Sequence, residues 1–383
     1  MDVSADPAAR PAWTGRLLVV GAGLMGTSLG LAVRRAGGTV HLHDRDAERL
    51  ALAASLGAGE PCPAGEPEPG CGGFDLAIVA VPPGQVAEVC IRLVRSAVAS
   101  VVSHIASVQT DIQVEVETQI PGVENFVGGH PVAGRETTGP AGADAGLFHG
   151  RAWAVCPPAS ASPEAVAALV QMIRATGAMP VQLGAREHDD LLARVSHVPQ
   201  LLASALAATL SADPGAASLA GPGFRDMTRL ADSPAQMWSE IVSANGPAVG
   251  QALDGLIAQL DDVRRHLGDQ GDEGGGSGAS AAVAELVERG HAGRALLPGK
   301  HGRPARLWAS VLVVISDEPG SLAQLFADVA ESEVNVEDLR LEHAPGRPRG
   351  VLDLAVAPSD RDRLLAALAE RGWSAVAGTE APL

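Results

Sequence analysis

The chain has no tyrosine and only one lysine, Lys300, among its 383 residues. No tyrosine can therefore act as a catalytic acid, and contacts to anionic ligands must come mainly from arginine. The four cysteines lack the CxxC spacing of metal and redox sites, so we expect free thiols in a reducing compartment and no metal centre. They are Cys62, Cys71, Cys90 and Cys156.

The sequence also lacks any apolar run near the ~20 residues that a membrane span needs. Residues 1–15 are rich in alanine, proline and aspartate and show no basic segment followed by an apolar one. The net charge of −17 argues against nucleic acid or an anionic membrane as a partner. These absences favour a cytoplasmic protein, and 383 residues are enough for two or three domains.

One stretch near the N-terminus has the pattern strand, glycine-rich turn, helix, strand, acid. A short apolar run, 17–20, precedes the turn 21–26 (GAGLMG), and helical spacing follows over 27–35. A second β-rich run, 39–43, ends at Asp44. An acid roughly twenty residues beyond such a turn completes the fingerprint of a dinucleotide site.

Each glycine of the turn has its own expected role. Gly21 permits the tight turn, Gly23 lets the backbone approach a pyrophosphate, and Gly26 lets the helix pack on the strand. The free N–H groups at the start of that helix would hold the phosphates. Asp44 would accept from ribose hydroxyls and repel a 2′-phosphate, which favours NAD, although Arg45 beside it could partly offset that repulsion. The expected cofactor-binding residues are Gly21, Ala22, Gly23, Leu24, Met25, Gly26, Asp44, Arg45 and Val81.

The periodicity of the chain changes twice. Strands alternate with helices over 16–185, which predicts an α/β fold with a Rossmann-type, doubly wound parallel sheet. Helical spacing predicts an all-helical dimerisation domain over 186–267. A flexible glycine-rich linker is expected over 268–280, and a short helix with a connector over 281–306. From 307 to 379 the pattern is βαββαβ, a ferredoxin-like split βαβ unit.

Polar residues just after the strands are the candidates for chemistry, because ligands of such sheets bind beyond the carboxyl ends of the strands. His130 has glycines before it and Pro131 after it, in an expected loop that follows a strand at 125–129. Neutral imidazole is the natural acceptor for a hydroxyl proton near neutral pH, so we interpret His130 as catalytic rather than structural. Ser107 follows a strand at 101–105, a position that suits a helix N-cap and a catalytic residue equally well.

The second domain is expected to contain three helices, over 187–212, 227–243 and 247–267. Pro199 lies inside the first of these patterns. A proline there frees or distorts a carbonyl in the preceding turn, near Val195.

Polar groups on these helices are further candidates. His197 and Gln200 are three residues apart and share a helix face. Arg225 and Arg229 also share a face, at i and i+4, where like charges cost stability unless anions or acids pair with them. They could form a carboxylate clamp, or they could pair with the neighbouring aspartates and solvent.

At this point the chain resembles the prephenate dehydrogenases of the form that carries a C-terminal ACT domain. The resemblance covers nearly everything from 17 to 377. Its carriers are GAGLMG, DLAIVAVP, SHIASVQ, GGHPVAGRETTG, LFHGRAW, EHDDLLARVSHVPQ, GFRDMTRLADSPAQMW and DEPGSLAQLFADVAESEVNVEDLRLEH. Several such segments in the right order are far more specific than any one of them.

The resemblance implies an enzyme of tyrosine biosynthesis that oxidises prephenate with NAD(P), releasing carbon dioxide and giving 4-hydroxyphenylpyruvate. It implies that His130 is the hydrogen-bond acceptor for the ring hydroxyl. Ser107 would bind the same hydroxyl and the nicotinamide side, and Arg229 would bind a substrate carboxylate. The implied pocket residues are Ser196, His197 and Gln200, and a network near the pocket mouth, joining the subunits of an expected homodimer, consists of Glu136, Arg225 and Trp238.

Two segments depart from the family pattern. Where the family usually reads Asp-Val-(Gly/Ala)-Ser-Val-Lys, this chain has His104 and Gln109 in place of the acid and the lysine. The family's SHLPH is SHVPQ here, with Gln200 for the second histidine. Because Gln200 is neutral, it could tolerate the amino group of arogenate, so arogenate or an amino-substituted prephenate is the alternative substrate.

The resemblance also implies that the C-terminal module binds an aromatic amino acid, with tyrosine as the expected effector, or else serves only in dimerisation. In that family the strand-to-helix turn and the facing strand form the ligand site, commonly across a dimer. The implied regulatory residues are Glu318, Pro319, Gly320, Ser321, Leu322 and Asn335.

A different class of function is a non-catalytic protein that senses an amino acid and the state of NAD. The joint presence of His130, Ser107 and Arg229 argues against it.

Overall fold

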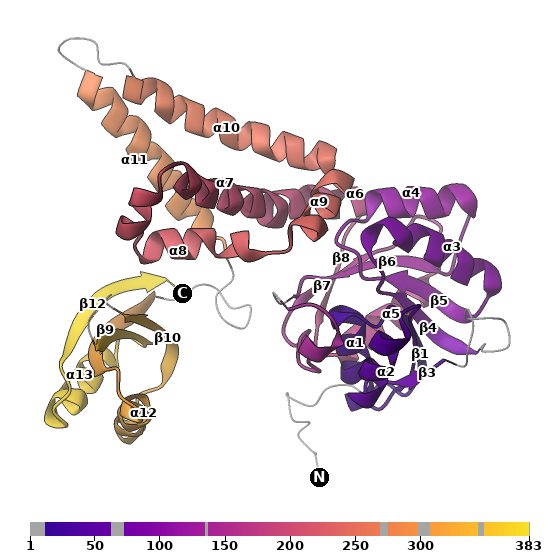
Figure 1. Ribbon diagram of the computed structural model, residues 1–383, viewed down its shortest axis with the longest axis horizontal. Coiled ribbons are helices and arrows are strands. Elements are labelled where there is room, and N and C mark those ends of the chain that lie inside the picture. The colour runs from indigo at the N-terminus through magenta and orange to yellow at the C-terminus, as the bar shows by residue number, and fades with distance from the viewer. Residues whose placement is uncertain are drawn as a thin grey trace. The chain divides into compact units, whose positions relative to one another are not determined.

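The computed structural model describes residues 12–62, 73–134, 137–268, 275–297, 307–343 and 348–382. The chain divides into two compact units, one ending at Ile257 and the other beginning at Ala258, and each unit is considered by itself (Figure 1). The division falls inside helix α10 (Gly246–Gly268).

Eight strands of the first unit form one sheet, in the order β3-β2-β1-β4-β5-β6-β7-β8. They are β1 (Arg16–Val20), β2 (Thr39–His43), β3 (Glu60–Pro61), β4 (Phe74–Val79), β5 (Ala99–His104), β6 (Phe126–Pro131), β7 (Ala152–Cys156) and β8 (Met179–Gln182). The strand order reverses at β1, which pairs with β2 on one side and β4 on the other. This is the switch point of a doubly wound sheet, and the predicted Rossmann-type fold is confirmed.

The expected all-parallel sheet is wrong at one edge. The strands from β1 to β6 are parallel, but β7 runs antiparallel to β6, and β8 is parallel to β7. Parallel neighbours need a crossover, usually a helix. Between Pro131 and Ala152 the described residues form only a short 3₁₀ turn, Pro140–Gly142, so the chain returns in the opposite direction.

Helices cover both faces of the sheet (Figure 1). They are α1 (Leu24–Arg35), α2 (Ala47–Ser55), α3 (Val86–Ser96), α4 (Thr110–Gln119) and α5 (Pro163–Ala175). In β1, Leu17 and Val19 pack with residues of α1, α2 and α5, whereas Leu18 and Val20 pack with residues of α3 and α4. Alternate side chains of a strand point to opposite faces, so a sheet buried on both sides needs this continuous apolar run.

The first predicted helix of the following region is present, with a local irregularity. Helix α6 (Ala185–Leu192) leads through a π-helical turn (Ala193–His197) into α7 (Val198–Ala212). The π turn lies just before Pro199 and contains Val195, as expected for a proline that cannot donate to the preceding turn.

The single helix predicted over 227–243 is wrong. The chain instead forms α8 (Pro222–Thr228), a 3₁₀ turn (Arg229–Asp232) and α9 (Ala235–Ala244). Pro234 explains the break, because a proline disfavours helical geometry in the residue before it.

The predicted glycine-rich linker is shorter than 268–280. Helix α11 runs from Gly275 to Arg294, so residues 275–280 are helical, and 269–274 lie outside the described residues. In this unit Arg289 of α11 donates to Oε1 of Gln259 on α10 at 3.1 Å. Glycine lowers helix propensity by about 1 kcal/mol but does not forbid a helix.

The remaining elements follow the predicted βαββαβ order. They are β9 (Leu307–Ser316), α12 (Ser321–Glu331), β10 (Val336–His343), β11 (Arg349–Val356), α13 (Arg361–Glu370) and β12 (Ala375–Pro382). The strands form an antiparallel sheet in the order β10-β11-β9-β12.

The register of this sheet separates two groups of predicted regulatory residues. Ser316, at the end of β9, pairs with Arg349, whereas Val336, at the start of β10, pairs with Val356. The turn after β9 and the segment before β10 therefore lie at opposite ends of the sheet, on the order of 25 Å apart. Asn335 and the turn residues 318–322 do not form one site within a single chain.

Candidate active site

The turn between β1 and α1 is shaped to receive a phosphate. Gly21 has a φ of +109°, and a Cβ there would clash with the carbonyl oxygen of Ala80. A Cβ on Gly26 would clash with the carbonyl oxygen of Gly21. At Gly23, the N-cap residue of α1, a Cβ would meet no described atom within 4 Å, and no described side chain caps the helix. The first N–H groups of α1 therefore have no side-chain cap among the described residues, and there is open space beside Gly23.

Asp44, directly after β2, is joined to this turn. Its Oδ2 accepts from the Ala22 N–H at 2.7 Å, and its Oδ1 accepts from the Asp46 N–H at 2.9 Å. A carboxylate has about four lone-pair positions, so Asp44 can brace the turn and still accept from a ribose. Arg45 is exposed beside it, and Val81 is half-buried in the loop after β4.

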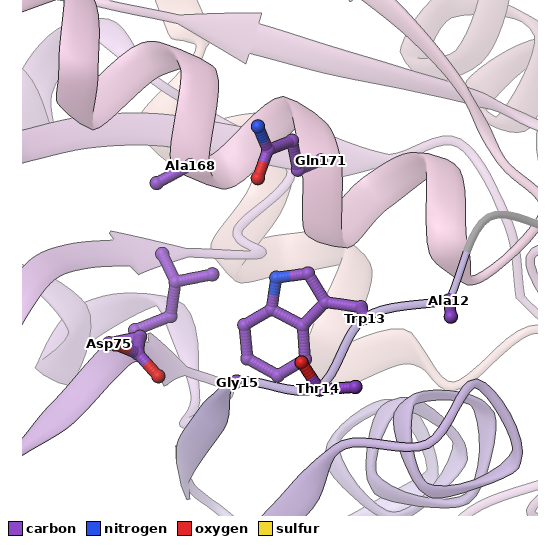
Figure 2. A pocket seen from close by; sticks show the side chains of 8 residues that line it. Ala12, Trp13, Thr14, Gly15, Asp75, Ala168 and Gln171 are labelled. Atoms are coloured by element: carbon purple, nitrogen blue, oxygen red, sulfur yellow. The ribbon is translucent and has the colours of Figure 1, made fainter.

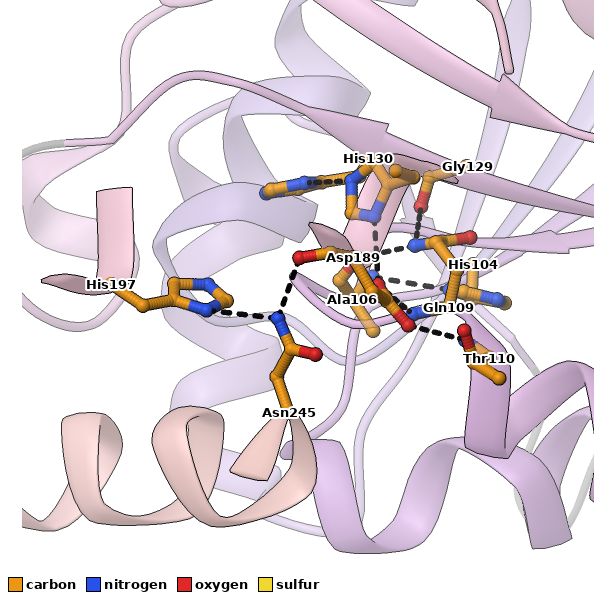
Figure 3. A network of polar contacts seen from close by, with 10 residues as sticks. His104, Ala106, Gln109, Thr110, Gly129, His130, Asp189, His197 and Asn245 are labelled. Atoms are coloured by element: carbon orange, nitrogen blue, oxygen red, sulfur yellow. Dashed lines mark hydrogen bonds and ion pairs between the residues drawn. The ribbon is translucent and has the colours of Figure 1, made fainter. Parts of the chain in front are cut away.

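His130 lies in β6 rather than in the expected loop, as the residue before the last one of that strand. Its Nδ1 is 2.9 Å from Nε2 of His188, on α6 (Figure 3). Nδ1 of His188 is in turn 2.9 Å from Oδ1 of Asp189. Both imidazoles are buried, and burial, followed by the proximity of the His188 ring, lowers the pKa of His130 to about 3.

Asp189 is held at the N-terminus of α4. Its Oδ1 accepts from the Gln109 N–H at 2.9 Å, and its Oδ2 accepts from the Thr110 N–H at 2.8 Å. Burial works to raise the pKa of this carboxyl, but hydrogen bonds from His188, Thr110 and Gln109 outweigh it and keep the pKa below its usual value. Asp189 is therefore ionised at neutral pH.

A second histidine, His197, is linked to Asp189 by hydrogen bonds through the side-chain amide of Asn245. Asn245, between α9 and α10, places its Nδ2 2.8 Å from the backbone oxygen of Asp189 and 3.1 Å from Nδ1 of His197 (Figure 3). His197 packs edge-on against Trp238, with ring centroids 6.1 Å apart. Burial lowers the pKa of His197, so this ring is also neutral at neutral pH.

Gln200 is buried on the next turn and joins α7 to the 3₁₀ turn. Its Nε2 donates to the backbone oxygen of Leu230 at 2.8 Å. Its Oε1 is buried and has no hydrogen-bond partner among the described residues.

The two residues that depart from the expected sequence pattern are buried near the same place. Nδ1 of His104 accepts from the Ala106 N–H at 3.2 Å, and burial lowers the pKa of His104 to about 3. Nε2 of Gln109 donates to the backbone oxygens of Ala106 at 2.7 Å and Gly129 at 3.3 Å. Two neutral side chains hold this loop together.

A cavity of about 480 Å³ lies near the amino-terminal ends of β1 and β4 (Figure 2). It is lined by Trp13 and Gly15, just before β1, and by Asp75 in β4, with Gln171 of α5 across from them. Ligands of open α/β sheets bind at the carboxyl ends of the strands, so this cavity is not the candidate site.

Comparisons with known proteins identify the family of this chain. Residues 29–182 match the family model "Prephenate dehydrogenase, nucleotide-binding domain", and residues 184–274 match "Prephenate dehydrogenase, dimerization domain". The chain is 34% identical to the probable prephenate dehydrogenase NovF of Streptomyces niveus, over 94% of this chain and 98% of that protein. The chain belongs to the prephenate dehydrogenase family.

Two further relatives extend the similarity. The prephenate dehydrogenase of Bacillus subtilis (strain 168) is 24% identical over 91% of this chain and 93% of its own length. The crystal structure of prephenate dehydrogenase from A. aeolicus has the same fold, with a TM-score of 0.65 at 24% identity, over 74% of this chain and 98% of that one. As a member of the family the protein is an oxidoreductase with a nucleotide-binding domain and a dimerization domain.

Among the residues that the structure describes, one helical stretch, Ala185–Ala212, is long and apolar enough to cross a membrane by length and composition alone. In this family member it lies within the matched dimerization domain. Its polar residues His188, Asp189, His197 and Gln200 are buried inside the protein and hydrogen-bonded there.

The structure brings several residues implied by the family resemblance close together. His197 contacts Trp238, and Gln200 contacts the residue after Arg229. Ser196 is half-buried in the π turn, and Ser107 is half-buried in the loop between β5 and α4. That loop is tied to Asp189 through its last residue.

The remaining residues implied by the resemblance are exposed or lie outside the described residues. Arg225 on α8 and Arg229 at the start of the 3₁₀ turn are exposed. Glu136 lies outside the described residues.

Three residues of the network were missed by sequence reasoning: His188, Asp189 and Asn245. They contact partners 48 to 80 positions away in the chain. The signal that could have found the first two is an adjacent histidine and aspartate at the start of an apolar helix, where burial forces polar groups to find partners.

Proposed function

We propose that this protein oxidises prephenate with NAD, producing 4-hydroxyphenylpyruvate, carbon dioxide and NADH in tyrosine biosynthesis. The observation that carries the proposal is the position of His130. It lies near the carboxyl end of a parallel strand, buried, with Nδ1 bonded to His188 and Nε2 on the opposite side of the ring. A neutral imidazole held in this way is suited to accept a proton from a substrate hydroxyl.

The reaction balances with His130 as a proton carrier. His130 accepts the hydroxyl proton as the carbinol carbon loses its hydride, and bound NAD supplies the hydride acceptor. The ring carboxylate leaves as carbon dioxide, its bonding electrons make the ring aromatic, and the proton returns from His130 to the phenolate oxygen. Because aromatisation supplies most of the driving force, the protein mainly positions the reactants.

NAD is the cofactor, and the residues of the β1–α1 turn fit it. The open position at Gly23 and the uncapped start of α1 suit a pyrophosphate. Asp44 suits the adenosine ribose and disfavours a 2′-phosphate. The A. aeolicus relative was crystallised with NAD+ and hydroxyphenyl propionate, which supports the same pairing here.

The remaining substrate contacts follow the family resemblance. Arg229 binds a substrate carboxylate, as suits a dianionic substrate in a chain with a single lysine. Ser107 hydrogen-bonds the ring hydroxyl and the nicotinamide side. Glu136, Arg225 and Trp238 form the network near the pocket mouth.

Arogenate is the second candidate substrate, and Gln200 is the observation that favours it. Because Nε2 of Gln200 donates to a backbone carbonyl, its buried Oε1 is an acceptor in need of a donor. The ammonium of arogenate could supply one, whereas the keto group of prephenate could not. Comparing kcat/KM for the two substrates decides between them: a ratio above about tenfold in either direction, equivalent to about 1.4 kcal/mol, identifies the substrate.

We further propose that the protein is a cytoplasmic homodimer joined through its helical region. The buried apolar cluster described in that region is small, consisting of Ala193, Val198 and Val249 with partly buried neighbours around it. Large apolar side chains remain exposed in the single chain, among them Leu219 at 88% and Met227 at 63%. Burial against a second copy would cover such side chains.

The C-terminal module, residues 307–379, is proposed to be an ACT-like regulatory domain that binds tyrosine. Gly320, with a φ of +94°, caps α12, and a Cβ there would meet no described atom within 4 Å. Backbone N–H groups of the turn 318–322 could hold a carboxylate. Since Asn335 lies at the other end of the sheet, a site that includes both needs a second copy of the unit.

A further inference from the structure

The hydrogen-bond chain that ends at His130 has a direction fixed by Asp189. An ionised carboxylate can only accept, so Nδ1 of His188 must carry the proton between them. The charge of Asp189 is already stabilised by two N–H groups at the start of α4. A neutral His188 therefore completes the contact without placing an imidazolium at a fully buried position.

A neutral His188 then determines the tautomer of His130. With its proton on Nδ1, His188 has an unprotonated Nε2 facing Nδ1 of His130 at 2.9 Å. Nδ1 of His130 must donate across this contact, because two facing lone pairs would repel. The remaining nitrogen of His130, Nε2, is consequently an acceptor.

The amide of Asn245 determines the tautomer of His197 in the opposite sense. The backbone oxygen of Asp189 can only accept, so the atom of Asn245 that lies 2.8 Å from it must be the NH₂ nitrogen. The other hydrogen of that group points to Nδ1 of His197 at 3.1 Å. Nδ1 of His197 is thus an acceptor, and a neutral His197 carries its proton on Nε2.

We infer that His188, Asp189 and Asn245 are positioning residues that hold two active-site histidines in opposite tautomers, with Nε2 an acceptor on His130 and a donor on His197. The carboxylate of Asp189 fixes the tautomer of His130 through His188, and its backbone carbonyl fixes the tautomer of His197 through Asn245. The substrate side of this inference rests on the proposed function. An acceptor at His130 receives the substrate hydroxyl, and a donor at His197 binds a substrate carboxylate or carbonyl oxygen.

Nitrogen NMR tests the inference without any substrate. In the full chain labelled with ¹⁵N-histidine, two-bond nitrogen–proton correlations show which ring nitrogen is protonated in each of the eleven histidines. The His130→Gln and His197→Gln variants assign the two signals. We expect His130 protonated on Nδ1 and His197 protonated on Nε2. A wild-type His130 protonated on Nε2, or two rings with the same tautomer, overturns the inference.

Matched substitutions at His188 test the causal link. Oε1 of a glutamine can accept where Nε2 of His188 accepts, so His188→Gln should keep the tautomer of His130 and retain kcat within about tenfold. Leucine offers no acceptor, so His188→Leu should allow His130 to become protonated on Nε2 and should lower kcat by about 10²–10⁴-fold, as for a wrongly oriented base. Retention of the wild-type His130 signal and kcat in folded His188→Leu contradicts the relay.

The Asn245→Leu variant tests the His197 side of the inference separately from the His130 side. It should release the tautomer of His197 and leave that of His130 unchanged. A simultaneous change in both rings would mean that the substitution acts through general disorder, and the separate roles would be rejected. If a variant does not fold, the wild-type tautomers still decide the question.

The outcomes separate this inference from the proposed function. Opposite tautomers without turnover of prephenate or arogenate would sustain the positioning roles and reject the proposed reaction. Turnover with His130 protonated on Nε2 would support the proposed reaction and reject the positioning roles.

Discussion

Burial controls the chemistry of individual histidines in this protein. His104 and His130 are both buried in the sheet, and burial lowers the pKa of each to about 3. The rings are therefore neutral at neutral pH and offer lone pairs rather than positive charge. In the proposed reaction, binding of a dianionic substrate falls to arginine, while His130 serves as the proton acceptor.

Replacing His130 tests its role directly. His130→Asn should retain NAD binding and lower kcat by about 10²–10⁴-fold, because the general base is lost while the turn at β1 is untouched. The matched control is His149→Asn, an exposed histidine outside the network. Steady-state rates of NADH formation measure both variants. A fall of less than tenfold in His130→Asn would show that another group accepts the proton.

The depressed histidine pKa values also predict acid sensitivity of the fold. In the unfolded chain these histidines bind a proton once the pH falls below about 6.5. In the native protein His104 and His130 stay unprotonated down to about pH 3. Their contribution to stability is thus complete above about pH 6.5 and is lost as the pH falls below it. Well inside this window, each histidine should lower the free energy of unfolding by about 1.4 kcal/mol for every unit by which the pH falls.

Urea unfolding at about pH 7 and about pH 5, followed by tryptophan fluorescence, measures this slope. His104→Asn should make the loss smaller, since its amide oxygen can still accept from Ala106 without titrating. A free energy of unfolding that is equal at the two pH values would refute the assignment of buried neutral histidines.

At the scale of single elements, two glycines decide what the β1–α1 turn can hold. A side chain at Gly26 would strike the backbone of Gly21, whereas one at Gly23 would enter the open space before α1. Gly26 is therefore needed for packing of the turn, whereas Gly23 is expected to leave room for the ligand.

A pair of alanine substitutions separates these effects. Gly23→Ala should leave the melting temperature close to that of the wild type and raise the KM for NAD, because the methyl occupies the phosphate position. Gly26→Ala should lower the melting temperature by several degrees, as expected for a backbone clash that costs on the order of 1–3 kcal/mol. If Gly23→Ala leaves the KM for NAD unchanged, the phosphates do not bind at this turn.

Most elements of the first unit could be predicted because their signals are local. Continuous apolar runs mark strands such as β1 and β4, and the glycine spacing marks the turn before α1. Helix α4 was missed because only Ile112 and Val116 of its ten residues are buried, which gives a weak period. The direction of β7 was also missed, although the absence of a helical pattern before it was a usable sign.

The site could be predicted only in part, for the same physical reason. His130 and Gln200 are marked by neighbouring residues and by the family resemblance. Asn245 carries no local mark, because its role arises from two contacts made 48 and 56 positions away. A single sequence does not reveal such pairings before the chain is folded.

At the scale of the whole molecule, regulation requires that the C-terminal unit favour one state of the enzyme over another. Removing residues after 297 keeps α10 and α11 and deletes the sheet of that unit. The truncated enzyme should keep its activity and lose most of its inhibition by tyrosine. Equal inhibition of the full and truncated chains would assign the effect to competition at the active site and end the regulatory interpretation.

The central claim is that this chain oxidatively decarboxylates a cyclohexadienyl substrate with NAD, with His130 as the proton acceptor. The most direct measurement is product stoichiometry: the purified full chain is incubated with prephenate and NAD, and NADH, carbon dioxide and 4-hydroxyphenylpyruvate are quantified together, with arogenate in a parallel reaction. The account predicts that the three prephenate products form in equal amounts and that His130→Asn suppresses all of them together. The account would be contradicted if no NADH formed with prephenate and none formed with arogenate, or if NADH formed without an equal amount of carbon dioxide.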